Sequence, residues 1–238
     1  MSGPYFLLID PYLKIPAESA INTILEIYSN LGRELDFPLP TIQFFFPSVS
    51  NIGLEGFLTS LSSRGMYPIS VISLGSYANL TDSVDWVTKF GIDLKSNIIE
   101  KGIPFLGICF SHQLFAHVYG SGVGYLRNPP QDAEGKKFHR FRSIEILHPR
   151  LKNFYSNSQE IIGHARHEQE VYNINLNELE LACTAKDSPF EGLIHRKFPA
   201  LSIQSHIETF HESNTGYKFI GAFLRSTLTS IHSNSYPF

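Results

Sequence analysis

One cysteine of this chain stands in a setting that suits nucleophilic chemistry. Cys109 follows the apolar run 104–108, and residues of helical character come directly after it. A nucleophile on such a strand-to-helix turn projects from the top of a sheet, and the strained turn favours small residues two places to either side, where Gly107 and Ser111 stand. The N-terminus of the following helix favours the thiolate, which is the nucleophilic form of cysteine.

A histidine and a glutamate with matching chemistry lie far downstream. His206 and Glu208 follow the apolar segment 200–204. A cysteine nucleophile needs a histidine that carries the thiol proton to the leaving group, and a carboxylate that orients this histidine. Singly, each residue has a structural explanation, since free cysteines are commonly buried and inert. The three together favour the catalytic interpretation.

Several segments resemble one enzyme family. Residues 104–113, PFLGICFSHQ, are similar to the nucleophile motif P-x-L-G-I-C-x-G-H-Q of class I glutamine amidotransferases, with Ser111 in place of Gly. Residues 204–208 resemble the family's Q-F-H-P-E, with Ser205 and Ile207 in place of Phe and Pro. Residues 73–82 are similar to its oxyanion loop, and Tyr77 replaces the customary Pro.

A fourth segment, RHEQEV at 166–171, resembles S-H-x-D-x-V, whose backbone helps to hold the amino-acid end of glutamine in that family. A solvated charged loop over residues 164–170 is an equally good interpretation. The resemblance covers residues 70–210, and the nearest subgroup is the stand-alone proteins similar to the amidotransferase domain of GMP synthase. It implies a flavodoxin-like three-layer sandwich.

The resemblance also implies a reaction and a set of site residues. Cys109 would attack the glutamine side-chain amide and form a γ-glutamyl thioester, with His206 as proton carrier and Glu208 as its orienting partner. Glutamate and ammonia would be the products, and neither a metal nor an organic cofactor would be required. Backbone N–H groups at Gly75 or Ser76 and at Phe110 would hold the oxyanion. Substrate contacts would come from Gln113, Arg166, His167 and Glu168.

The order of elements predicted from hydrophobic periodicity agrees with such a fold. In the first half, apolar runs predict strands at 5–9, 41–46, 69–74 and 104–108. Helical spacing predicts helices at 17–31, ending at Gly32, at 54–64 and at 84–101, with a break at Gly91. This alternation predicts an α/β fold, with a mostly parallel sheet between helices and ligands at the carboxyl ends of the strands. In the second half we expect strands at 141–147, 179–185, 192–195 and 200–204, and a helix at 215–230.

Length and composition favour one globular domain over residues 1–238. The 26.9 kDa chain has 42% hydrophobic and 17% charged residues, which excludes a disordered chain. Its 19 basic and 22 acidic residues give a net charge of 19 − 22 = −3, so neither nucleic acid nor a membrane surface is an expected partner. Two cysteines cannot form a disulfide framework, and no secretory signal or membrane span is apparent. We therefore expect a cytoplasmic protein.

Three functions stay open from the sequence. The first is a glutaminase-type amidotransferase domain; because no nucleotide-binding loop of the synthetase type is present, any acceptor reaction would occur on a separate synthetase subunit. The second is a γ-glutamyl peptidase or hydrolase that acts on γ-glutamyl conjugates. The third is a catalytically silent binding or regulatory relative on the same fold. The segment 120–142 is interpreted as a hairpin or a lid, and Cys183 as a core residue.

Overall fold

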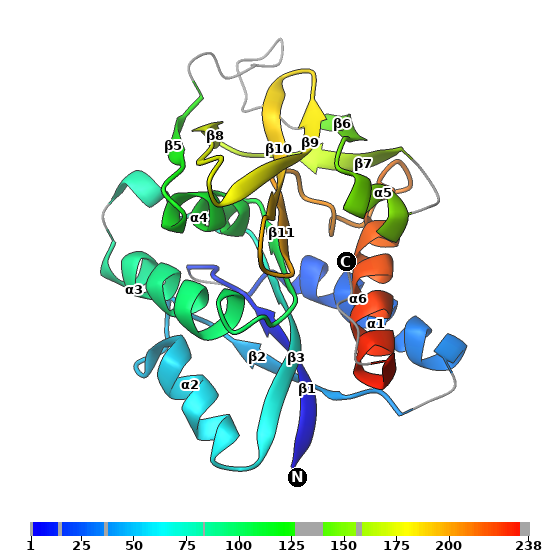
Figure 1. Cartoon of the computed structure of the whole chain (residues 1–238). Helices are drawn as coiled ribbons and strands as arrows, with labels where there is room; N and C mark the ends of the chain where they lie inside the picture. The colour runs from blue at the N-terminus through cyan, green and yellow to red at the C-terminus, as the bar shows by residue number, and fades with distance from the viewer. Residues whose placement is uncertain are drawn as a thin grey trace.

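The computed structural model describes residues 2–13, 16–35, 38–82, 84–126, 140–155 and 159–233. The predicted α/β fold is confirmed: a nine-stranded sheet lies between two layers of helices (Figure 1). Two further strands, β5 (Gly122–Tyr125) and β8 (Gln169–Asn173), form a separate antiparallel pair.

Half of the large sheet is parallel and has the order β2-β1-β3-β4-β11. This is the strand order of flavodoxin-like sheets, in which ligands bind outside the carboxyl ends of the strands. Both faces of these strands are covered, which explains their unbroken apolar runs; residues 5–9, for example, are fully buried. The strands are β1 (Gly3–Ile9), β2 (Thr41–Phe45), β3 (Met66–Ser73), β4 (Phe105–Ile108) and β11 (Ala200–Ile203).

The other half of the sheet is antiparallel and continues from β11 as β10-β9-β6-β7. Sequence periodicity predicted three of these strands but missed β7, as it missed β5 and β8. β7 is an edge strand whose buried residues alternate with partly exposed ones, so it lacks a continuous apolar run. The four strands are β6 (Arg140–Ile146), β7 (Glu160–Ala165), β9 (Leu179–Ala185) and β10 (Ser188–His195).

Helices α1 (Glu18–Leu35) and α6 (Gly216–Ser233) pack on one face of the sheet, next to the short α5 (Pro149–Phe154). Helices α2 (Gly53–Ser62), α3 (Asp85–Leu94) and α4 (Phe110–Val118) pack on the other (Figure 1). The 3-10 turn η1 (Leu80–Asp82) precedes α3.

Two predicted helix boundaries were wrong. α1 continues beyond Gly32, because Leu35 also packs against the core, and such burial outweighs the small helix propensity of one glycine. The helix over 84–101 does not break at Gly91; it changes at Lys95 into the π-helical turn η2 (Lys95–Ile99).

The predicted hairpin or lid over 120–142 is described in part. β5 pairs with β8, and residues 127–139 lie outside the described residues. Within the ranges given above, none of the helices has both the length and the apolar character needed to cross a membrane.

Candidate active site

The backbone at Cys109 has the sharp turn expected of a nucleophile between a strand and a helix. Cys109 lies between β4 and α4 and has φ 54° and ψ −108°. Among the described residues it is the one non-glycine residue with positive φ. Such a conformation costs about 1–3 kcal/mol and persists only where the surrounding structure enforces it. A Cβ at position 107 would lie 2.9 Å from the backbone oxygen of Ser111, so glycine is required there.

The parallel sheet brings three chain segments together at this point. β4 lies between β3 and β11, and the backbone N–H of Cys109 donates to Ile203 at 2.9 Å. A Cβ at position 75 would lie 2.8 Å from Cε1 of His206 and 3.3 Å from Cβ of Cys109. The loop after β3, the turn after β4 and the segment after β11 are therefore in direct contact, and position 75 has no room for a side chain.

His206 and Glu208 form a hydrogen-bonded pair. Nδ1 of His206 donates to Oε1 of Glu208 at 2.6 Å, which leaves the other ring nitrogen for the sulfur of Cys109. Burial by itself lowers the pKa of His206, but Cys109 and Glu208 both interact with the ring and raise that pKa well above 6.5. Backbone bonds between His206 and His164, at 2.9 and 3.1 Å, anchor the segment to the end of β7.

The backbone groups predicted to hold an oxyanion lie around Cys109. Phe110 is the first residue of α4, so its N–H has no carbonyl partner within the helix. The loop with Gly75 and Ser76 is fixed through the Ser76 hydroxyl, which donates to the carbonyl of Pro11 at 2.7 Å and accepts from the N–H of Ala78 at 3.0 Å.

Ser111 connects the nucleophile helix to this loop. Its side chain is fully buried, and Oγ donates to the carbonyl of Leu74 at 2.7 Å. Oγ of Ser73 also lies 2.7 Å from Oγ of Ser111. The departure from the family motif at position 111 therefore adds a side-chain contact between α4 and the strand that leads to Gly75.

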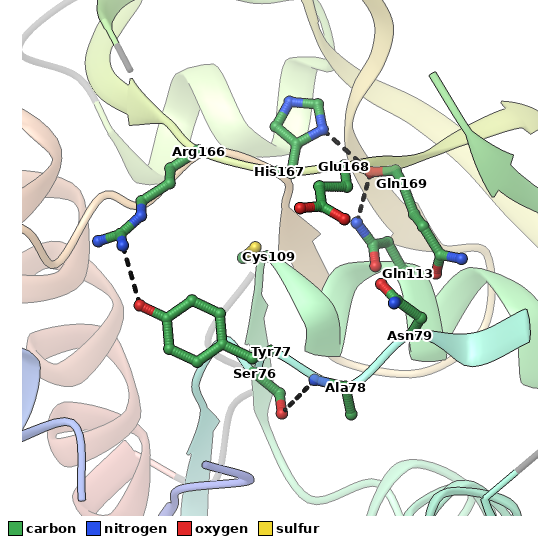
Figure 2. Close-up of a pocket in the computed structure, with 10 residues that line it drawn as sticks. All are labelled: Ser76, Tyr77, Ala78, Asn79, Cys109, Gln113, Arg166, His167, Glu168 and Gln169. Carbon is green, nitrogen blue, oxygen red and sulfur yellow. Dashed lines mark hydrogen bonds between the residues drawn. The ribbon is translucent and has the colours of Figure 1, made fainter. Parts of the chain in front are cut away.

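A pocket of about 420 Å³ opens beside Cys109 (Figure 2). In this view Tyr77 and Arg166 lie on one side of the cysteine, and the amide side chains lie on the other. The four predicted substrate-binding residues, Gln113, Arg166, His167 and Glu168, all line it. The structure adds lining residues that the sequence interpretation did not select, namely Tyr77, Ala78, Asn79 and Gln169.

The carbonyl oxygen of Gln169 fixes the wall opposite Tyr77. It accepts from Nε2 of Gln113 at 2.6 Å and from Nδ1 of His167 at 2.9 Å (Figure 2). Burial, together with nearby Arg142, lowers the pKa of His167 to about 4, so its ring is neutral near pH 7 and carries its proton on Nδ1. His167 therefore supports the pocket wall instead of offering a charge to a ligand.

A buried ion pair lies behind this wall and was not predicted. The guanidinium of Arg142 donates to the carboxylate of Glu191, which is fully buried, and to Asp187 at 3.0 Å. Arg142 also contacts Nε2 of His167 at 3.3 Å and Oγ of Ser205 at 3.1 Å. No spacing signal could reveal it, because the cluster combines residues of β6, of β10 and of three segments between strands or after β11.

Two other side chains have structural surroundings. His112 bonds through Nδ1 to Oγ of Ser202 at 2.9 Å, and burial lowers the pKa of its ring to about 3. Cys183 is fully buried in β9, and burial together with Glu191 raises the pKa of its thiol.

Comparison with known proteins identifies the family. The family model described as "Glutamine amidotransferase class-I" matches residues 79–225, which include both the nucleophile turn and the segment after β11. The chain belongs to this family. The predicted resemblance of the chain to class I glutamine amidotransferases is thereby confirmed.

Two curated relatives of this class-I amidotransferase chain are parts of synthases. The "Carbamoyl phosphate synthase small chain" of Bacillus anthracis is 34% identical over 122 residues, or 49% of this chain and 28% of that protein. One subunit of the glutamine-hydrolyzing GMP synthase of Methanococcus aeolicus is 27% identical over 122 residues, or 49% of this chain and 56% of that protein. The matches thus span about a quarter to a half of the length of these relatives.

The fold of this amidotransferase chain matches that of solved structures over its whole length. A glutamine amidotransferase from Thermotoga maritima superposes with a TM-score of 0.63, covering 99% of this chain and 100% of that one at 16% identity. At this identity the likeness supports the fold alone.

Proposed function

We propose that the protein hydrolyses the side-chain amide of glutamine through a thioester on Cys109, and that Cys109, His206 and Glu208 are its catalytic residues. The observation that carries this proposal is the contact of His206 with both Cys109 and Glu208 at the edge of a pocket with room for an amino acid. Membership of the amidotransferase family supports the same chemistry.

The first step is thioester formation. The sulfur of Cys109 attacks the γ-carbonyl carbon while its proton passes to His206, and N–H groups at Phe110 and in the loop at Gly75 and Ser76 stabilise the oxyanion. Collapse of the resulting tetrahedral intermediate breaks the C–N bond. His206 returns the proton to the nitrogen, and ammonia leaves. Water then attacks the thioester, which gives glutamate and restores the thiol.

The glutamyl half of the substrate would occupy the pocket beside Cys109. Arg166 offers a cation for the α-carboxylate, and Glu168 offers an anion for the α-ammonium. Gln113 donates to the carbonyl of Gln169 and so stabilises the wall of the pocket. The polar lining suits a charged amino acid better than an apolar ligand.

The ammonia would pass to a separate synthetase subunit. Support comes from the names of the relatives, which are a small chain of carbamoyl phosphate synthase and one subunit of GMP synthase. Which synthetase acts as the acceptor is a question for co-purification, because the matching segments span only part of those proteins.

A product assay tests the proposal. Purified protein incubated with glutamine is expected to release glutamate and ammonia in equal amounts. Cys109→Ser is expected to release neither, whereas Cys183→Ser keeps the wild-type rate because that thiol is fully buried in β9 and does not line the pocket. A folded wild-type protein that binds glutamine without turnover would favour the silent relative instead.

A further inference from the structure

The side chain of Gln204 lies against the sulfur of Cys109. Gln204 directly follows β11 and is buried. Its amide nitrogen, Nε2, lies 3.8 Å from Sγ of Cys109 and donates a hydrogen bond to it. The mechanism proposed above gives this amide no role, although it contacts the reacting atom.

Neighbouring groups fix which end of this amide faces the sulfur. The backbone carbonyl of Gln169 can only accept, so the atom of Gln113 that lies 2.6 Å from it is the donor Nε2 (Figure 2). The same nitrogen lies 3.2 Å from the side-chain amide of Gln204, so the atom of Gln204 that faces it is the acceptor Oε1. The nitrogen of Gln204 is thereby turned toward Cys109.

The buried ion pair behind the pocket wall holds the backbone of Gln204. The N–H of Gln204 donates to the carbonyl of Glu191 at 2.8 Å, and the N–H of Ser205 donates to Oε1 of Glu191 at 2.8 Å. Arg142 binds the other carboxylate oxygen of Glu191. Because the backbone and Oε1 of Gln204 are both fixed, its side-chain N–H faces the sulfur without a rearrangement during the reaction.

Negative charge on the sulfur of Cys109 is largely shielded from water, since the residue is only 5% exposed. His206 interacts with the sulfur and is cationic when it holds the thiol proton. Gln204 is neutral, so its N–H is a donor at every pH at which the protein is folded. Other titratable or charged side chains face this side of the sulfur from the pocket lining or act through His206, namely Tyr77, Arg166, His167, Glu168 and Glu208.

We propose that Gln204 is a further catalytic residue, whose amide N–H stabilises negative charge on the sulfur of Cys109. This inference rests on the thioester mechanism proposed above. The charge arises first when the thiol proton passes to His206 and the sulfur attacks. It arises again when water has attacked the thioester, because the C–S bond breaks and its electron pair returns to the sulfur. The thiolate then recovers a proton from His206, which took it from the attacking water.

Alkylation by iodoacetamide at two pH values tests this inference, because the reagent reacts with the thiolate and needs no substrate. Every protein would carry Cys183→Ser, so that Cys109 is the one thiol. Gln204→Met keeps the length of the side chain but has no N–H. Gln204→Glu keeps an acceptor for Gln113, and it replaces the methionine variant if thermal unfolding shows that variant to be unfolded. Gln43→Met, in β2 and not in the pocket lining, is the matched control.

We expect Gln204→Met to react about tenfold or more slowly than the control at pH 7, because less of its thiol is ionised. At pH 9.5, above the usual range of cysteine ionisation, its rate should reach that of the control. Gln204→Glu should show at least the same loss at pH 7, since its carboxylate repels the thiolate. A purely structural role would slow the reaction equally at both pH values.

Glutamate release from glutamine, measured on the same proteins, separates this inference from the proposed function. We expect kcat to fall about tenfold or more in Gln204→Met and to stay unchanged in Gln43→Met. Alkylation at pH 7 as fast as in the control, or an equal loss at both pH values, would overturn the inference, and glutamate release by the wild type would leave the proposed function intact. A wild type that releases no glutamate would overturn the proposed function, and the catalytic role of Gln204 with it.

Discussion

Nδ1 of His206 and Oε1 of Glu208 lie 2.6 Å apart, although the two residues are separated by only one position. The contact forms because the chain leaves the strand conformation after β11, and Asn214 holds the bend by donating to the carbonyl of Thr209 at 2.6 Å. The pair fixes the orientation of the His206 ring, so that its other nitrogen, Nε2, faces Cys109. The reactivity of Cys109 should therefore depend on Glu208.

Replacement of Glu208 by Gln tests this dependence. The amide keeps the size of the side chain but lacks the charge that raises the pKa of His206. We expect kcat for glutamine to fall by about 10²–10⁴, by analogy with the effect of orienting carboxylates elsewhere, and KM to change little. Steady-state kinetics with glutamate release as the readout would measure kcat and KM for both proteins. An unchanged kcat would exclude Glu208 from the mechanism.

The same pair should make stability depend on pH. The pKa of His206 is higher in the folded protein than its ordinary value of 6.5. Its stabilising contribution is therefore complete below about pH 6.5 and is lost as the pH rises through the folded pKa. We expect the difference in unfolding free energy between wild type and Glu208→Gln to shrink from about pH 6 to pH 9, as measured by urea denaturation. A difference that grows with pH would contradict the assignment.

Ser111→Gly tests the departure from the family motif. From the sequence, restoring glycine is expected to preserve or raise activity, but the structure predicts a different result. The Ser111 hydroxyl bonds to Leu74 and to Ser73, and its loss frees the strand end that leads to Gly75. We expect kcat to fall several-fold, with Ser111→Thr or Ser111→Ala used to separate the hydroxyl from the volume. Activity at or above wild type in Ser111→Gly would show that these bonds do not position the loop.

The buried ion pair behind the pocket should contribute strongly to stability. Arg142→Met leaves the fully buried Glu191 without its cation, and breaking such a pair costs about 3–5 kcal/mol. The double replacement Arg142→Met with Glu191→Gln should cost less, because the uncompensated charge is gone. Urea denaturation of the two variants would measure both values. A double variant less stable than Arg142→Met would show that the unpaired charge of Glu191 is not the cause of the lost stability.

The parallel half of the fold could be predicted from the sequence, and so could the contact between its strand ends. Fully buried strands such as β1 and β4 appear as unbroken apolar runs. Cys109 directly follows β4, and His206 comes three residues after the end of β11. The carboxyl ends of adjacent parallel strands meet at one edge, so residues far apart in sequence are placed together. The family motifs supplied the roles that periodicity alone does not give.

The rest of the site could not be predicted because it depends on partners from distant segments. The interpretation of 164–170 as a solvated loop did not anticipate that Gln169 would be buried and that its carbonyl would join Gln113 to His167. Arg142 and Glu191 lie in antiparallel strands whose alternation gives no sign of an ion pair. Edge strand β7 lacks the apolar run that signals burial.

The most direct test of the central claim is intact-mass spectrometry of the protein after incubation with a diazoketone analogue of glutamine. We predict a single adduct on the wild type, protection by excess glutamine, and no adduct on Cys109→Ser. Because Cys183 is fully buried, Cys183→Ser should label as the wild type does. A folded wild type that stays unlabelled, or an adduct that persists in Cys109→Ser, would contradict the assignment of Cys109 as the nucleophile.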